Sequence, residues 1–111
     1  MKRVFRFRVV DKGTFKDIKS GAKSIETRAG SLRYKNIKAG DTAVFVCGKD
    51  KFEKPIKKVK SFKTLDRLFS HYGIRKIMPG LTIREAFKMY ESYPGYRLKL
   101  KKFGIIAFEL R

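Results

Sequence analysis

The segment Gly21–Arg28, with the sequence GAKSIETR, concentrates side chains that can do chemistry. Lys23, Glu26 and Arg28 fall within six positions of one another. A lysine beside a carboxylate can transfer protons when burial shifts its pKa. A carboxylate beside an arginine can instead orient the guanidinium toward a base edge or a phosphate. The segment therefore predicts either acid–base chemistry by Lys23 and Glu26 or recognition of a polar ligand by all three residues.

The spacing of these three residues decides whether they can share a pocket. Side chains alternate between the two faces of a strand, so Glu26 and Arg28 would lie on one face and Lys23 on the other. A common pocket then requires the chain to bend near Lys23. The alternative is an exposed Glu26–Arg28 ion pair, which would contribute only about 0–1 kcal/mol to stability.

Other catalytic or metal-binding patterns are absent from the sequence. The chain has one histidine, His71, and one cysteine, Cys47, without the spacing of a zinc site. It has no Gly-x-Ser-x-Gly segment and no glycine-rich phosphate-binding loop. Cys47 lies in an apolar run and is expected in the core. We therefore expect no metal and no cofactor.

The pattern of apolar residues predicts the elements that must position the segment. Alternating or continuous apolar residues predict five strands, at Val4–Val10, Lys23–Thr27, Asp41–Cys47, Pro55–Phe62 and Gly104–Leu110. Capping residues predict three helices, which begin at Thr14, Thr64 and Thr82. Gly21 is expected to end the first helix. The remaining stretches are expected to be a loop at Ala29–Gly40, a connector at Ile74–Gly80 and a weakly alternating segment at Tyr96–Lys102.

The order of these elements indicates the fold class. Strands and helices do not alternate regularly, which is typical of an α+β protein with a mainly antiparallel sheet. We expect this sheet to curl into a small β-barrel, with helices covering its openings, in one domain over residues 1–111. No apolar run predicts a transmembrane helix or signal peptide, and the single cysteine favours a reduced, cytoplasmic location.

The charge of the chain indicates its class of partner. The 111 residues include 29 Lys and Arg against 10 Asp and Glu, a net charge of +19. A polyanion would offset the resulting self-repulsion, and nucleic acid is the commonest one. Cations interleave with aromatic rings, as suits unpaired bases, in four groups: Arg6 and Arg8; Arg33, Tyr34 and Lys35; Lys57, Lys58 and Lys60; and Arg97, Lys99, Lys101 and Lys102. The alternative is a lysine-rich surface that aids solubility.

The composition also indicates the source. The chain has no glutamine, one asparagine and many lysines. Thermophilic proteins avoid thermolabile amides and are enriched in charge. We therefore expect a heat-adapted protein.

The chain resembles a known family over nearly its whole length. The resemblance rests on Phe15-x-x-Ile18-x-x-Gly21-x-Lys23-x-x-Glu26-x-Arg28, on Ile37-x-x-Gly40-Asp41-x-x-x-Phe45, and on the closing segment Phe103–Leu110. This pattern resembles the ASCH domain family of the PUA-like superfamily. The resemblance implies a small β-barrel with a cleft lined by Lys23, Glu26 and Arg28. It also implies a role in binding RNA, linked to translation or transcription.

Some bacterial members of that family hydrolyse N4-acetylcytidine with a lysine, a threonine and a glutamate. Lys23 matches the position of the lysine, whereas Glu26 stands where the threonine would be. The region expected to supply the glutamate reads Ile74-Arg75-Lys76 and contains no acidic residue. Two of the three catalytic groups are therefore missing. We therefore expect a monomeric RNA-binding module that does not associate with membranes. Hydrolysis of a modified nucleoside or of RNA is the alternative.

Overall fold

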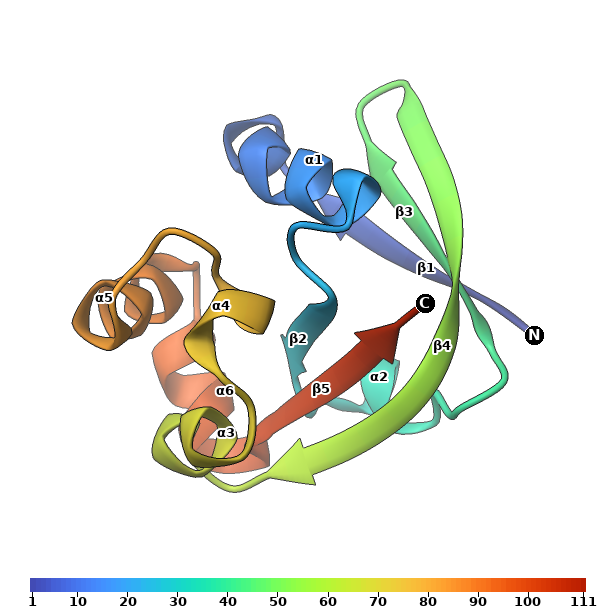
Figure 1. Ribbon diagram of the computed structural model, residues 1–111. Coiled ribbons are helices and arrows are strands. Elements are labelled where there is room, and N and C mark those ends of the chain that lie inside the picture. Colours follow the sequence, from blue (N-terminus) through green and yellow to red (C-terminus); the bar gives the residue numbers. More distant parts are fainter.

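The computed structural model describes all residues, 1–111, as an α+β fold built on one five-stranded sheet (Figure 1). The strand order is β1-β3-β4-β5-β2. The strands are β1 (Lys2–Phe7), β2 (Ile25–Ala29), β3 (Thr42–Cys47), β4 (Asp50–Phe62) and β5 (Ile105–Leu110). The helices are a 3-10 turn η1 (Val9–Asp11), α1 (Lys12–Ser20), α2 (Leu32–Lys35), α3 (Leu65–His71), α4 (Ile74–Ile77), α5 (Ile83–Ser92) and α6 (Tyr96–Phe103).

The sheet is mainly antiparallel, as the sequence predicts, but it does not close into a barrel. Only β1 and β3 pair in parallel, and the other three pairings are antiparallel. β1 and β2 lie at the two ends of the strand order and do not pair with each other. Side chains bond two of the backbone groups on these edges instead: Arg28 donates to the carbonyl of Arg6, and Glu26 accepts from the N–H of Thr27. The expected barrel is therefore an open sheet.

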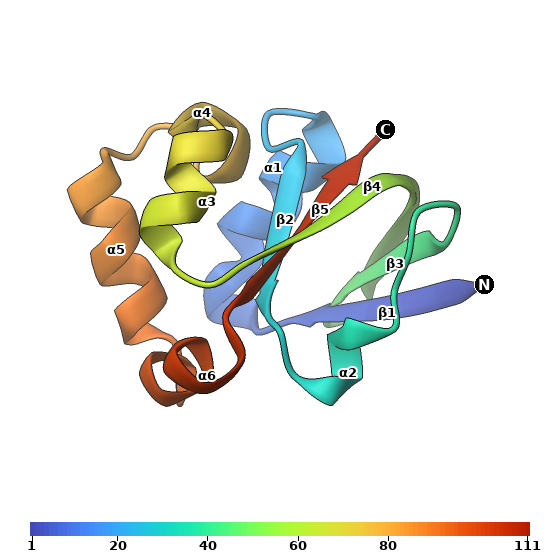
Figure 2. The ribbon, with the colours of Figure 1, turned by 90° about the horizontal axis from the view of Figure 1, so that it is seen from below.

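β5 is buried on both of its faces, which explains why five of its six residues are apolar. Ile106 and Phe108 on β5 join the larger core cluster, which includes Phe5, Phe15 and Phe45. The intervening Ile105 and Ala107 join a second cluster beneath α3, α4 and α5, which Tyr90 also enters. Helices α3 to α6 group on one side of the sheet (Figures 1 and 2). Cys47 is buried, as expected.

Three of the four predicted helix signals are confirmed. Thr64 accepts a hydrogen bond from the N–H of Arg67 and caps α3. Thr82 and Glu85 form a reciprocal capping box at the start of α5. Gly21 ends α1 with a φ of 89°, a conformation that glycine adopts without steric cost. None of the helices is long and apolar enough to cross a membrane.

Several of the expected segments have wrong bounds. β1 stops at Phe7, and Val9 and Val10 form the exposed turn η1 rather than continuing the strand. α1 begins at Lys12, so Thr14 lies inside the helix rather than capping it. The expected loop contains α2, and the expected connector contains α4. β4 begins at Asp50 and runs through Pro55, where the neighbouring Ile56 supplies the backbone donor to Asp41.

The segment expected to alternate weakly as a strand is instead helix α6. Its sequence, YRLKLKKF, alternates charge and apolar residues over a few positions and so imitates a strand. The decisive contacts come from Tyr96 and Leu100, which are four residues apart and pack against the second core cluster. Leu98, which a strand would have turned inward with Leu100, is 76% exposed. A strand would place Leu98 on the same face as Tyr96 and Leu100. A helix instead buries Tyr96 and Leu100 while Leu98 faces solvent, as observed.

Candidate functional site

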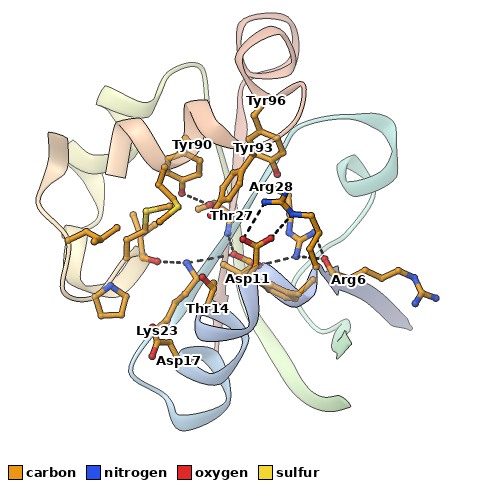
Figure 3. Close-up of a pocket in the computed structure, with 18 of the residues that line it drawn as sticks. Arg6, Asp11, Thr14, Asp17, Lys23, Thr27, Arg28, Tyr90, Tyr93 and Tyr96 are labelled. Atoms are coloured by element: carbon orange, nitrogen blue, oxygen red, sulfur yellow. Dashed lines mark hydrogen bonds and ion pairs between the residues drawn. The ribbon is translucent and has the colours of Figure 1, made fainter. Parts of the chain in front are cut away.

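A cleft of about 340 Å³ opens between the unpaired edges of β1 and β2 (Figure 3). Its walls come from the end of β1, from α1, from β2, from residues 77–81 and from the segment joining α5 to α6. Lys23, Glu26 and Arg28 all line it. The three residues that the sequence singles out therefore converge on one cavity.

Lys23 reaches this cavity because the chain departs from strand geometry there. β2 begins only at Ile25, and the N–H of Lys23 donates to the carbonyl of Asp17 in α1 at 3.0 Å. The side chain then turns to the same side as Glu26, and Lys23 Nζ lies 3.6 Å from Glu26 Oε1. Lys23 Nζ also donates to the carbonyl of Ile77 at the end of α4. The predicted bend near Lys23 is therefore present.

Glu26 is the centre of the charge cluster. Its Oε1 accepts a hydrogen bond from the N–H of Thr27 at 2.8 Å, and its Oε2 accepts one from Arg28 Nη2 at 3.1 Å. Only 4% of Glu26 is exposed. The buried Glu26 carboxylate thus contacts a backbone N–H of β2, the Lys23 amine and the Arg28 guanidinium.

The guanidinium of Arg28 donates hydrogen bonds to other groups of the protein. Both Nη atoms donate to the carbonyl of Arg6 at 3.3 Å, and Nη1 also donates to the hydroxyl of Tyr34 at 3.0 Å. Its guanidinium lies 4.8 Å from the ring centroid of Phe7 and 5.3 Å from that of Phe5. The sequence predicted a guanidinium aimed at a ligand. In the structure, the guanidinium of Arg28 joins β2 to β1.

Burial lowers the pKa of Lys23 below its ordinary value, and the neighbouring charge of Arg28 acts in the same direction. Glu26 opposes this shift by favouring the protonated amine. Lys23 therefore loses its proton more readily than an ordinary lysine does. The resulting neutral amine can accept a proton or a hydrogen bond.

Three tyrosines at a spacing of three residues form the opposite wall. Tyr90 shares a hydrogen bond with the hydroxyl of Thr27, and Tyr96 accepts from the N–H of Ala29 at 3.4 Å. The hydroxyl of Tyr93 has no hydrogen-bond partner, and burial raises the pKa of Tyr93 to about 12. Tyr93 therefore offers a neutral ring and a free hydroxyl to a ligand.

The sequence analysis did not assign these tyrosines to the site. The available signal was their regular spacing across the break at Pro94, which brings successive rings to one side of the chain. Thr14 and Asp17, on successive turns of α1, also line the cleft and were not predicted. Neither makes a side-chain hydrogen bond or an ion pair, so both remain available to a ligand.

The predicted nucleic-acid-binding residues fall into three groups. Arg6 and Arg8 lie at the cleft, where Arg8 pairs with Asp11 at 2.8 Å and sits over the Tyr93 ring at 5.8 Å. Tyr34 contacts Arg28 from α2. The remaining residues are exposed and do not line the cleft: Arg33 and Lys35 on α2, Lys57, Lys58 and Lys60 on β4, and Arg97, Lys99, Lys101 and Lys102 on α6.

No group of three or more histidine, cysteine or acidic side chains is arranged to hold a metal ion. Two of the three carboxylates that line the cleft, Asp11 and Glu26, each have an arginine partner.

Comparison with known proteins yields fold relatives. The crystal structure of the hypothetical protein PH0355 is 27% identical, with a TM-score of 0.86 over 100% of this chain and 98% of that one. The solution structure of protein PF0455 from the thermophilic archaeon Pyrococcus furiosus is 24% identical, with a TM-score of 0.77 over 100% and 96% of the two chains. No protein-family model and no curated protein matches the chain. The α+β fold is therefore shared with these two proteins over its full length.

Proposed function

We propose that this protein is an RNA-binding module, of the kind that its resemblance to ASCH and PUA-like domains implies. The observation that carries the proposal is the cleft itself: Lys23, Glu26 and the free Tyr93 hydroxyl surround a space of about 340 Å³ in a chain of net charge +19. Small-molecule sites span roughly 300–1,000 Å³. An unpaired base or a terminal nucleoside would stack on the aromatic wall and bond to the polar groups.

The surroundings of the cleft support contact with the rest of an RNA chain. α6 begins at Tyr96, which lines the cleft, and continues outward with the exposed cations Arg97 and Lys101. α2 lies at the same end of the molecule (Figure 2), and the N–H of Gly30 just before it donates to the carbonyl of Gly104 just after α6, at 3.0 Å. The cations of both helices can therefore hold phosphates while the cleft holds a base.

A salt titration tests this proposal. The affinity for a labelled single-stranded RNA should fall with salt, with a slope in log K against log salt of about −0.7 per phosphate contact. Tyr93→Leu should weaken binding without changing that slope, because it removes a ring and no charge. Arg97→Ala with Lys101→Ala should reduce the slope. A flat salt dependence, or no binding at moderate salt, would contradict the proposal.

Hydrolysis of a modified nucleoside is a second candidate. The observation that favours it is that a hydroxyl, an amine and a carboxylate, from Thr27, Lys23 and Glu26, line one cleft. These are the group types used by the amidohydrolases that the sequence resembles. The Thr27 hydroxyl is bonded to Tyr90, however, and no hydrogen bond joins it to Lys23. Release of acetate from N4-acetylcytidine, abolished by Lys23→Ala and by Thr27→Val, would establish this activity.

The same proposal extends to the setting in which the protein acts. A monomer that binds RNA in the cytoplasm, with the translation or transcription machinery, fits the charge and the single buried cysteine. Sedimentation with and without RNA would test the monomer, and cross-linking in cells would identify the RNA.

A further inference from the structure

A second hollow lies where β4 ends and α3 begins, and it shares no residue with the cleft. It is a shallow groove of about 610 Å³, and seven of its eight lining residues are polar or charged. Lys60, Phe62 and Lys63 border it from the end of β4 and the following turn, and Arg67 and His71 border it from α3. The sequence analysis placed only Lys60 among the binding residues.

The cations of this groove have no anionic partner. Lys60, Lys63 and Arg67 are exposed, and none of them belongs to any ion pair of the molecule. The only carboxylate in the groove, Asp66, is likewise in no ion pair. Thr64 accepts from the N–H of Arg67 at 3.2 Å and so fixes the first turn of α3 beside the end of β4. Three cations and a single carboxylate therefore line one groove, and a bound polyanion would offset the excess positive charge.

Two aromatic rings, those of Phe62 and His71, line the same groove as these cations. The rings of Phe62 and His71 are 5.5 Å apart between centroids, and Lys60 Nζ lies 5.9 Å from the Phe62 centroid. His71 is exposed, whereas Phe62 is partly buried against the second core cluster. The Phe62 ring therefore packs between that cluster and His71. A ring face beside several free cations suits a nucleotide, because the base can stack while the phosphate meets the charges.

We propose that this β4–α3 groove binds a phosphodiester-linked nucleotide of a single-stranded RNA, at a point separate from the cleft. Lys60, Lys63 and Arg67 hold the backbone phosphates, and His71 stacks on the base. The proposal rests on the RNA-binding function proposed above. It adds a second attachment point, so that a longer RNA binds more tightly than the nucleotide that the cleft alone can hold.

The charges are tested by fluorescence anisotropy with a labelled, unstructured oligouridine. Lys63→Ala with Arg67→Ala should weaken binding and make the salt slope shallower by about 0.7 for each phosphate that the variant no longer neutralises. Lys16→Ala with Lys19→Ala is the matched control, since it removes two exposed charges from α1, outside both sites. The control should leave the slope unchanged.

The ring is tested by His71→Ala. This exposed substitution should weaken binding of the single strand by about five-fold or more, because the base no longer has a ring on which to stack, and should leave the salt slope unchanged. A fully paired RNA duplex, whose bases cannot reach the ring, should bind the variant and the parent equally.

The outcomes separate this inference from the function on which it rests. If the unaltered protein binds RNA but the groove variants behave like the control, the groove is not a binding site and only this inference fails. Equal weakening for duplex and single strand would overturn the stacking role of His71. If the unaltered protein binds no RNA at moderate salt, both proposals fail.

Discussion

At the scale of single residues, the feature that defines this protein is a buried carboxylate between two cations. Glu26 accepts from Arg28 and lies 3.6 Å from Lys23, while both Lys23 and Glu26 are almost completely buried. Buried charges cost free energy unless they are paired. The three residues should therefore behave as one unit, in which removal of the anion affects both cations.

Glu26→Gln should destabilise the protein by about 3 kcal/mol, because Arg28 and Lys23 would remain buried without an anion. The amide keeps the shape of the side chain and can still accept from Thr27, so the destabilisation reports on charge. Urea unfolding measures it. Glu53→Gln is the control: Glu53 pairs with Lys2 at the surface, and that change should cost less than about 1 kcal/mol. Equal destabilisation in the two variants would show that the buried cluster contributes no more than a surface pair.

Lys23 should make stability depend on pH above neutrality. Its pKa is lower in the folded protein than the 10.5 of an exposed lysine, so the unfolded chain binds more protons between those two values. The free energy of unfolding must then rise with pH through this window, up to the unfolded pKa. The charged groups that face Lys23 are Asp17 from α1 and Glu26 and Arg28 from β2.

Comparison with Lys23→Met isolates this contribution, because the tyrosines titrate alike in both proteins. The stability of the parent relative to the variant, from urea unfolding between pH 7 and about 10, should increase with pH. A difference that stays constant over that range would show that Lys23 keeps its charge when folded.

At the scale of elements, the open side of the sheet is the feature on which the site depends. β1 and β2 leave a gap that the Arg28 guanidinium spans, by donating to Arg6 and packing on Phe7. Residues of both edges line the cleft, so pairing of β1 with β2 by backbone hydrogen bonds would remove part of the cavity. The unpaired edges therefore position the site.

Arg28→Lys should loosen these edges, because an ammonium group cannot donate to Arg6, Tyr34 and Glu26 at once in the planar geometry that the guanidinium provides. We expect stability to fall by about 2 kcal/mol and amide exchange in β1 and β2 to become faster. Arg33→Lys serves as the control, since Arg33 is exposed and contacts only the Tyr34 ring. If exchange in β1 and β2 were unchanged in Arg28→Lys, the guanidinium would not be what joins them.

At the scale of the whole molecule, composition predicts high thermal stability despite the charge. The chain carries +19 yet has a single asparagine and no glutamine, a bias that accompanies heat adaptation. Ordinary mesophilic domains melt at about 45–65 °C. We expect a Tm above that range by calorimetry at moderate salt. A Tm within it would contradict the expected heat-adapted source.

The fold was predictable where the signals are local. Thr64 and Thr82 begin helices, and Gly21 ends one, through hydrogen bonds with residues three positions away. The centres of the strands follow from the pattern of apolar residues. α6 was not predictable in this way. Its charge alternation fits a strand, and only the packing of Tyr96 and Leu100 against residues far away in the sequence selects the helix.

The candidate site likewise combines features that local sequence signals predict with features that only long-range packing determines. Sequence alone singled out Lys23, Glu26 and Arg28, but strand alternation made a shared pocket depend on a bend near Lys23. Tertiary structure decided what surrounds them: Lys23 bonds to Ile77, 54 residues away, and Thr27 to Tyr90, 63 residues away. Such contacts depend on which helices cover which face of the sheet, a choice made by burial of the whole core. That packing, not local spacing, turned Arg28 toward β1 and left Tyr93 facing the cleft.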